Sequence, residues 1–285
     1  MKYTFMKHTF MALLLASNFA LCQDNRPGST QVTTPDRVTV PFSDASRPRM
    51  VKCSLLNGAI SVKGYAGKDV IVEARPRNEE HRSRRGADRP DGMRRIDVNT
   101  TGLSVEESDN VVVIGTRSHQ ESIDVTIQVP FDTSLKLHGT NGGDIVVDHV
   151  SGEIEINNTN GSAIATHISG TAVLHSLNGK VQASLDKVTA DKAMSFSTLN
   201  GDIDVTMPAD TKAKVKMKSD NGEIYSDFDV RLDASGRQPV VEDNRSGKGK
   251  YRFRFDKAMY GTINGGGPEM QFTTFNGNVY IHKLK

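Results

Sequence analysis

Four charged residues at regular spacing are the strongest candidates for catalysis in this sequence. Lys180, Asp202 and Glu223 each follow the glycine of an Asn-Gly pair in three consecutive repeats, and Asp204 lies two residues after Asp202. We expect consecutive repeats to stack on one another, with these four side chains facing outward. Paired carboxylates can cleave glycosidic bonds, but they need a partly desolvated site with shifted pKa values, which nothing in the sequence indicates. Opposite charges on neighbouring strands also form an ordinary stabilising ladder. We therefore expect no enzymatic activity, and the alternative is a polysaccharide-active β-helix enzyme that uses the acidic face around Asp202.

The positions of histidine and cysteine argue against a metal centre. His138 and His175 each lie three residues before the Asn of an Asn-Gly pair, and Asn157 has that place in the repeat between them. If each repeat is one coil, the two histidines lie ~10 Å apart, which is too far for one zinc ion. The chain has no His-Glu-x-x-His motif, Gly-x-Ser-x-Gly elbow, phosphate-binding loop or closely spaced pair of cysteines. We expect no metal and no cofactor.

An arginine-rich segment, residues 74–95, is the strongest candidate for ligand binding. It has no strand pattern, and its charge density favours a solvated surface insertion. Its alternative role is an anion-binding loop, because planar guanidinium groups fit phosphate, sulfate or an acidic glycan. The candidate contact residues are Arg82, Arg84, Arg85, Arg94 and Arg95.

A repeated phrase indicates how these side chains are positioned. The phrase "TLNGDIDV" at Thr198 is one of seven similar stretches, each with an Asn-Gly pair; the pairs begin at Asn57, Asn141, Asn160, Asn178, Asn200, Asn221 and Asn276. Four residues before each Asn lies an apolar residue: Cys53, Leu137, Ile156, Leu174, Phe196, Met217 and Phe272. Shortly after each Gly comes an apolar β-branched residue: Ile60, Ile145, Ile164, Val181, Ile203, Ile224 and Val279.

The period of two predicts strands whose apolar residues face inward on both sides of a tight corner. Asn and Gly suit the corner because both tolerate positive φ, although ordinary β-hairpins use the same signal. Between Asn141 and Asn200 the pairs lie 19, 18 and 22 residues apart, and such regular steps favour stacked coils. We predict an all-β, single-domain parallel β-solenoid over residues 38–285, with coils of about 18–22 residues and an Asn ladder at the corners. A hairpin sandwich is the alternative.

The N-terminus has the pattern of a secretory signal peptide over residues 1–22. Lys2 and Lys7 precede a short apolar run, and small residues lead to Cys22. We expect removal of this segment and a flexible leader over residues 23–37. Membrane attachment is expected only under the alternative that Cys22 carries a lipid.

Once residues 1–22 are removed, Cys53 is the remaining cysteine, and we expect it in the core. Further along the chain, a polar insertion is predicted at residues 233–250.

Composition narrows the range of partners. The chain has 36 Lys and Arg against 34 Asp and Glu, a formal net charge of +2. A charge so close to zero gives no electrostatic argument for nucleic-acid binding.

The sequence does not determine the oligomeric state. The end strands of a solenoid can pair with those of another copy unless they are capped.

The sequence also resembles a known family. Its features are Val-Pro pairs at Val40 and Val129, the Thr-x-Asn-Gly-x-Ile pattern, Ser-Gly pairs at Ser151 and Ser169 halfway between Asn-Gly pairs, and three glycines at residues 265–267. Together with the signal peptide, they are similar to bacterial "putative adhesin" proteins of the DUF4097 type, from about Val38 onward. The resemblance implies a β-solenoid in the bacterial periplasm, cell envelope or cell surface, and it supplies no catalytic residues. The predicted function is a non-enzymatic structural or adhesive module that binds envelope polysaccharide or a surface protein. An envelope-stress binding protein that uses the arginine-rich loop is a further alternative.

Overall fold

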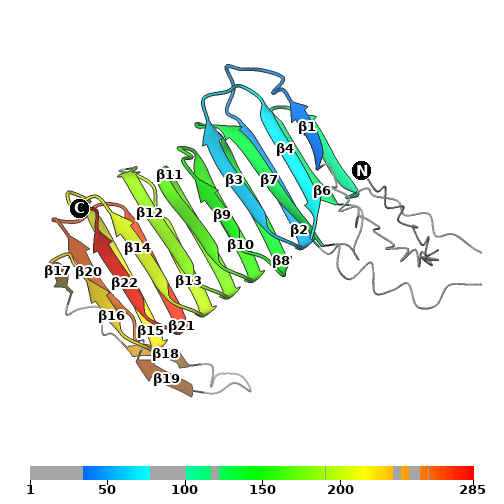
Figure 1. Cartoon of the computed structure of the whole chain (residues 1–285). Helices are drawn as coiled ribbons and strands as arrows, with labels where there is room; N and C mark the ends of the chain where they lie inside the picture. The colour runs from blue at the N-terminus through cyan, green and yellow to red at the C-terminus, as the bar shows by residue number, and fades with distance from the viewer. Residues whose placement is uncertain are drawn as a thin grey trace, which may run out of the picture. The chain divides into compact units, whose positions relative to one another are not determined.

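Every regular element in the described part of the chain is a β-strand (Figure 1). The computed structural model describes residues 35–77, 101–116, 122–189, 191–233, 239–243, 251–255 and 257–285. The chain divides into two compact units, Met1–Val32 and Thr33–Lys285, and all described residues belong to the second. In these described ranges no helix is long and apolar enough to cross a bilayer. The predicted signal peptide lies outside them.

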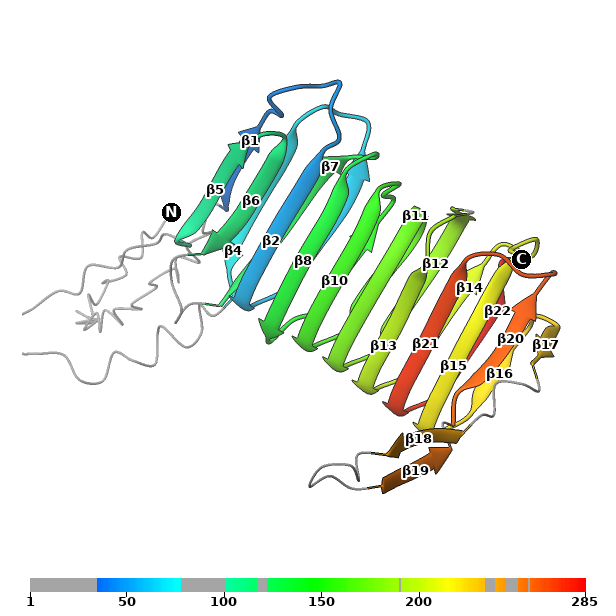
Figure 2. The ribbon, with the colours of Figure 1, turned by 180° about the vertical axis from the view of Figure 1, so that it is seen from behind.

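Twenty strands form one continuous hydrogen-bonded sheet, which is folded into two layers. We call the layers sheet I and sheet II, and the long strand β11 passes from one to the other. Sheet I contains, in spatial order, β5 (Leu103–Ser108), β6 (Val111–Thr116), β2 (Met50–Asn57), β8 (Ser134–Asn141), β10 (Glu153–Asn160), the second half of β11 (Ala163–Asn178), β13 (Met194–Asn200), β21 (Glu269–Asn276), β15 (Ala213–Asn221), β20 (Met259–Ile263) and β17 (Val230–Leu232). Figure 2 shows this sheet.

Sheet II contains, in the same direction, β1 (Asp36–Val40), β4 (Val70–Pro76), β7 (Ile123–Pro130), β3 (Ile60–Tyr65), β9 (Ile145–Asp148), the first half of β11, β12 (Val181–Val188), β14 (Ile203–Met207), β22 (Val279–Lys283) and β16 (Ile224–Ser226). The strands β18 (Pro239–Asp243) and β19 (Tyr251–Phe255) form a separate antiparallel pair.

Each of the seven Asn-Gly pairs forms the corner of a coil, between a strand of sheet I and a strand of sheet II. The apolar residues of both sheets point into the space between them and form one core. All seven apolar residues predicted four positions before the corner Asn are buried. The position after the corner differs in one coil, where Ala163 is buried and in register with Ile145, so the predicted Ile164 lies on the outer surface and is half-buried.

The prediction of an all-β fold is confirmed, but the strands are not all parallel. From β6 to β15 in sheet I, and from β7 to β16 in sheet II, neighbouring strands run parallel. At one end β1, β4 and β5 pair antiparallel with their neighbours, and at the other end β20 and β17 do so. The architecture is therefore solenoid-like and of mixed orientation. Chain reversals at the ends cover strand edges that a purely parallel stack would leave unpaired.

The coils do not stack in the order of the sequence. The C-terminal coil, β21–β22, lies between the coils β13–β14 and β15–β16, and the β21 ribbon is visible between β13 and β15 in Figure 2. At the other end, the β2–β3 coil lies between the strands β6 and β7 on one side and the β8–β9 coil on the other. The sequence predicted consecutive stacking. Because every coil carries the same corner phrase, the local sequence permits either order.

Three predicted segment boundaries differ from the structure. β1 begins at Asp36, so the end of the predicted leader, residues 36–37, is strand. β4 continues to Pro76 with Ala74 fully buried, so the first residues of the arginine-rich segment belong to the stack. The segment predicted as a polar insertion, residues 233–250, contains β18, because its residues pair with β19. Residues 78–95 lie outside the described ranges.

Candidate functional site

The Asn-Gly corners are joined by a row of side-chain hydrogen bonds. In five coils the Asn Nδ2 donates to the Asn Oδ1 of an adjacent coil, over 2.7–3.0 Å. These five bonds join Asn141, Asn160, Asn178, Asn200, Asn276 and Asn221 in that order. Asn57 is in register with Asn141 at one end of the row. The ladder predicted from the sequence is confirmed, and it holds the corners at a fixed spacing.

A second row of hydrogen bonds lies beneath the first. The small polar residues two positions before the Asn donate their hydroxyls to a glycine carbonyl of the adjacent coil: Ser176 to Gly161, Thr198 to Gly179, Thr274 to Gly201 and Ser219 to Gly277, at 2.9–3.0 Å. Asn158 fills the same place with its amide, which donates to Gly143 and Ser162. The corners are therefore a rigid scaffold for the outward-facing side chains.

The acidic face predicted as a catalytic candidate is used to join coils. The Asp202 Oδ1 accepts the backbone N–H of Asn278 at 2.7 Å, and Asn278 in turn accepts the N–H of Glu223. Asn278 thus separates Asp202 from Glu223, which the sequence placed in neighbouring coils. Lys180 Nζ lies 3.3 Å from Asp204 Oδ2, as expected for a charge ladder.

The C-terminal coil brings aromatic residues onto this acidic face. Tyr280 is in register with Asp204 on one side and Tyr225 on the other, and the two tyrosine rings stack with centroids 5.3 Å apart. His282 Nδ1 lies 3.1 Å from Asp227 Oδ2. The hydrogen bond from His282, followed by that from the Lys283 amide, holds the pKa of Asp227 below its ordinary value. Sequence order concealed this grouping, because Asp204 and Tyr280 belong to coils that are far apart in the chain.

The outer surface of sheet I carries a block of nine residues without a Lys, Arg, Asp or Glu, which we call the central face. Its three strands are β11, β13 and β21, and its residues are Val173, His175, Leu177, Ser195, Ser197, Leu199, Gln271, Thr273 and Phe275. Four are large apolar side chains exposed to solvent: Val173 (43%), Leu177 (37%), Leu199 (41%) and Phe275 (46%).

Charged residues border the central face on both sides. On the β10 side, Glu155 is in register with Val173 and pairs with Lys136 at 3.0 Å. On the β15 side, Lys216 and Lys218 are in register with Gln271 and Thr273, and Lys218 pairs with Asp220 at 3.4 Å. Exposed apolar side chains within a polar rim are typical of a surface that binds another molecule. Because Phe275 comes from the C-terminal coil, sequence reasoning missed this surface.

His138 and His175, the two histidines at equivalent places in the repeat, lie too far apart to bind one zinc ion, as predicted. His138 and His175 are both in register with Asn157, which occupies the strand between them. His175 Nδ1 is 2.9 Å from Ser197 Oγ, within the central face.

The prediction that Cys53 belongs to the core is also confirmed, since its side chain is buried and burial raises the pKa of the thiol to about 12.

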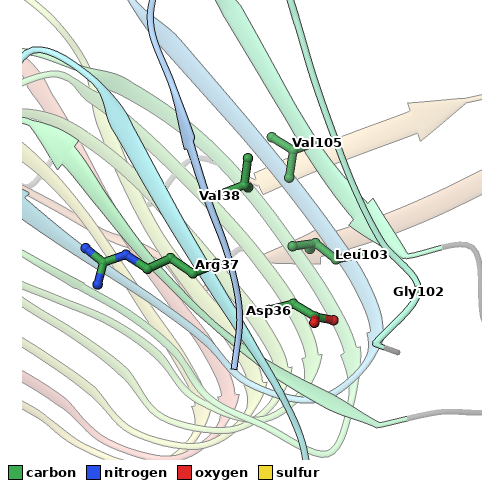
Figure 3. Close-up of a pocket in the computed structure, with 6 residues that line it drawn as sticks. All are labelled: Asp36, Arg37, Val38, Gly102, Leu103 and Val105. Carbon is green, nitrogen blue, oxygen red and sulfur yellow. The ribbon is translucent and has the colours of Figure 1, made fainter. Parts of the chain in front are cut away.

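A cleft of about 380 Å³ lies between β1 and β5 at the end of the stack (Figure 3). Val38, Leu103 and Val105 line it and are half-buried against the core. The Asp36 Oδ2 accepts hydrogen bonds from the Thr101 amide and hydroxyl, and Arg37 is directed away from the apolar residues toward Glu73, 3.1 Å away. Both charged groups of the cleft are therefore already engaged.

The predicted anion-binding residues cannot be placed in this site. Arg82, Arg84, Arg85, Arg94 and Arg95 all lie outside the described residues. The described arginine nearest to them in sequence, Arg77, lies 3.7 Å from Asp124 across the β4–β7 pair. The role of the arginine-rich loop stays a prediction.

Stacked coils with Asn ladders at their corners define this chain as an all-β, solenoid-like repeat protein. It belongs to the DUF4097 family, because the family model described as Toastrack DUF4097 matches residues 38–258. The resemblance predicted from the repeated phrases is confirmed. The coil β21–β22 lies beyond the matched range.

Two solved structures are similar over most of the chain. A "putative cell adhesion protein" from Clostridium sporogenes is 11% identical and covers 88% of this chain and 100% of its own, with a TM-score of 0.38. A "putative adhesin" from Bacteroides fragilis is 10% identical and covers 88% of this chain and 98% of its own, with a TM-score of 0.27. No curated protein matches the chain.

Proposed function

We propose that this chain is a non-enzymatic binding module of the bacterial envelope or cell surface, and that it binds a protein through the central face. The observation that carries the proposal is the exposure of four large apolar side chains on three adjacent strands: Val173, Leu177, Leu199 and Phe275. Soluble proteins seldom leave such side chains together in water unless a partner covers them.

The rigidity of the scaffold supports a binding role. Leu177, Leu199 and Phe275 each directly precede an Asn of the corner ladder, so the hydrogen bonds of the ladder hold their backbones in place. A surface that is already ordered loses little conformational entropy when a partner binds. The central face therefore needs no rearrangement before it can be covered.

The chemistry of the face favours a protein over a glycan. Three of its four large apolar residues are aliphatic, and they gain free energy by removing apolar area from water. His175, Ser197 and Thr273 offer hydrogen bonds between them, as in the mixed surfaces at which proteins meet. A charged rim with both signs adds specificity through complementary charge.

Export and a non-catalytic role complete the proposal. The pattern over residues 1–22 supports secretion, and family membership agrees with the envelope or surface location that the resemblance implied. The carboxylate of Asp202 is committed to a backbone amide, which supports a structural role over the polysaccharide-active alternative.

Binding of the purified full chain to envelopes of the producing bacterium tests the proposal. The variant Leu177→Ser/Leu199→Ser/Phe275→Ser should bind about tenfold more weakly or worse, since hot-spot truncations cost at least that much. Val113→Ser is the control, because Val113 is at least as exposed, on β6 of the same sheet, and lies outside the central face. Protease treatment of the envelopes should abolish binding.

Two results would overturn the proposal. Binding that survives protease and disappears when envelope polysaccharide is removed would identify a glycan ligand. Cleavage of envelope polysaccharide by the chain, lost in Asp202→Asn/Asp204→Asn, would establish the enzyme alternative.

A further inference from the structure

Three potential metal ligands meet at the second corner of two adjacent coils. Asp148 ends β9, His149 follows it, and His167 lies at the equivalent corner within β11. The Asp148 Oδ2 lies 2.8 Å from His149 Nδ1, and the Asp148 Oδ1 lies 3.2 Å from His167 Nδ1. One ligand atom from each residue lies within 4.8 Å of the others.

The backbone is bent so that the two imidazoles come together. His149 and His167 have φ values of 56° and 50°, in the left-handed region that residues other than glycine seldom adopt. Their rings stack with centroids 4.6 Å apart. Both Nδ1 atoms consequently face the same carboxylate.

We propose that Asp148, His149 and His167 bind one divalent transition-metal ion of the zinc class. Two imidazole nitrogens and one carboxylate oxygen suit Zn²⁺ and Co²⁺, which take three protein ligands and a water molecule in open sites. In the metal-free protein each neutral imidazole can donate its Nδ1–H to Asp148. Metal binding requires that proton to move to Nε2 through water, which frees the Nδ1 lone pair.

The surroundings of the three residues fit such a site. The hydroxyl of Thr166 donates to the Asp148 Oδ1 at 2.8 Å and fixes the carboxylate, as outer hydrogen bonds do in metal centres. The side chains of His149 and His167 are 51% and 55% exposed, so an ion can enter from solvent. Lys63, in register with Asp148 in the preceding coil, is the neighbouring cation and limits the affinity.

The position of the site indicates what the ion would do. The pairing of β11 with β12 shifts register between Ala165 and Ile168, next to His167. A metal ion that joins His149 to His167 would fasten the coil of β9 to the coil of β11, on the edge of β11 opposite this irregularity. Its role would be structural, and it is independent of partner binding at the central face.

Titration of the chelator-treated full chain with Zn²⁺ and with Co²⁺ tests the proposal. We expect one equivalent bound, a tetrahedral Co²⁺ absorption spectrum, and a Zn²⁺-dependent rise in Tm. His149→Asn and His167→Asn should each weaken binding about tenfold or more and remove the rise in Tm. Asn is chosen because it tolerates the left-handed conformation and so keeps the corner folded.

His138→Gln and His175→Gln are the controls, because these histidines lie on sheet I with a strand between them. They should bind Zn²⁺ as the unaltered chain does. Failure of the unaltered chain to bind either ion would overturn the proposal. So would unchanged stoichiometry and affinity in His149→Asn and His167→Asn, since another group of residues would then hold the ion.

Discussion

Asn276 donates a hydrogen bond of 2.7 Å to Asn200, although 76 residues separate them in the sequence. The bond places the C-terminal coil inside the stack, where Asn276 also accepts from Asn221. The central face depends on this arrangement, because Phe275 is next to Asn276 and completes the row begun by Leu177 and Leu199. The aromatic residues beside Asp204 reach their place through the same coil.

Replacing one ladder residue should destabilise the stack. Asn200→Ala removes the donor to Asn178 and the acceptor for Asn276, so we expect a loss of about 1–2 kcal/mol in the free energy of unfolding. Denaturant unfolding measures it. The control is Asn157→Ala, whose amide donates to Glu155 on the outer surface, so stability should change by about 0.5 kcal/mol or less. Equal losses in the two variants would show that the ladder does not stabilise the coils.

The Cys53 thiol should resist alkylation while the chain is folded. Burial raises its pKa to about 12, so it stays protonated at all ordinary pH values, and the thiolate is the reactive form. Iodoacetamide labelling at about pH 8, followed by peptide mass mapping, should modify Cys53 only after denaturant is added. Labelling at the same rate with and without denaturant would place the thiol at the surface.

The carboxyl group of Asp227 should titrate below its ordinary pKa of 3.8. Because the folded-state pKa is depressed, its contribution to stability is present above the ordinary value and is lost as the pH falls through the folded-state value. Carbon-detected NMR titration of the side chain measures the midpoint. His282→Ala removes the main cause and should raise it, whereas His175→Gln leaves the partners of Asp227 intact and should not. A midpoint unmoved by His282→Ala would contradict the hydrogen bond.

Much of the fold could be predicted because its signals are local. The apolar residue four places before each corner, as in Leu137 and Phe196, and the Asn-Gly pair itself specify strand, inward face and turn within a few residues. The same phrase permits each coil to pair with any other, so it predicts neither the place of Asn276 beside Asn200 nor the antiparallel strands at the ends.

The candidate sites were harder to predict because they join residues from different coils. The central face needs Phe275 beside Leu199, which follows only from the order of the coils. The Asp148–His149–His167 cluster did leave a signal: Asp148 and Thr166 are 18 residues apart, the same separation as Asn160 and Asn178. Applying the coil period to the second corner, and not only to the Asn-Gly corner, would have brought the two histidines together.

The C-terminal coil, β21–β22, lies between the coils β13–β14 and β15–β16, and disulfide cross-linking tests this position most directly. In the stack Ser197 is in register with Thr273, and Thr273 with Lys218, so Ser197 and Lys218 are separated by a strand. Adjacent strands bring α-carbons within disulfide range, and strands two apart do not. Mild oxidation of the folded chain should therefore cross-link Ser197→Cys/Thr273→Cys and leave Ser197→Cys/Lys218→Cys reduced. Cross-linking of the second pair and not the first would mean that the coils follow sequence order, and the central face would then lack Phe275.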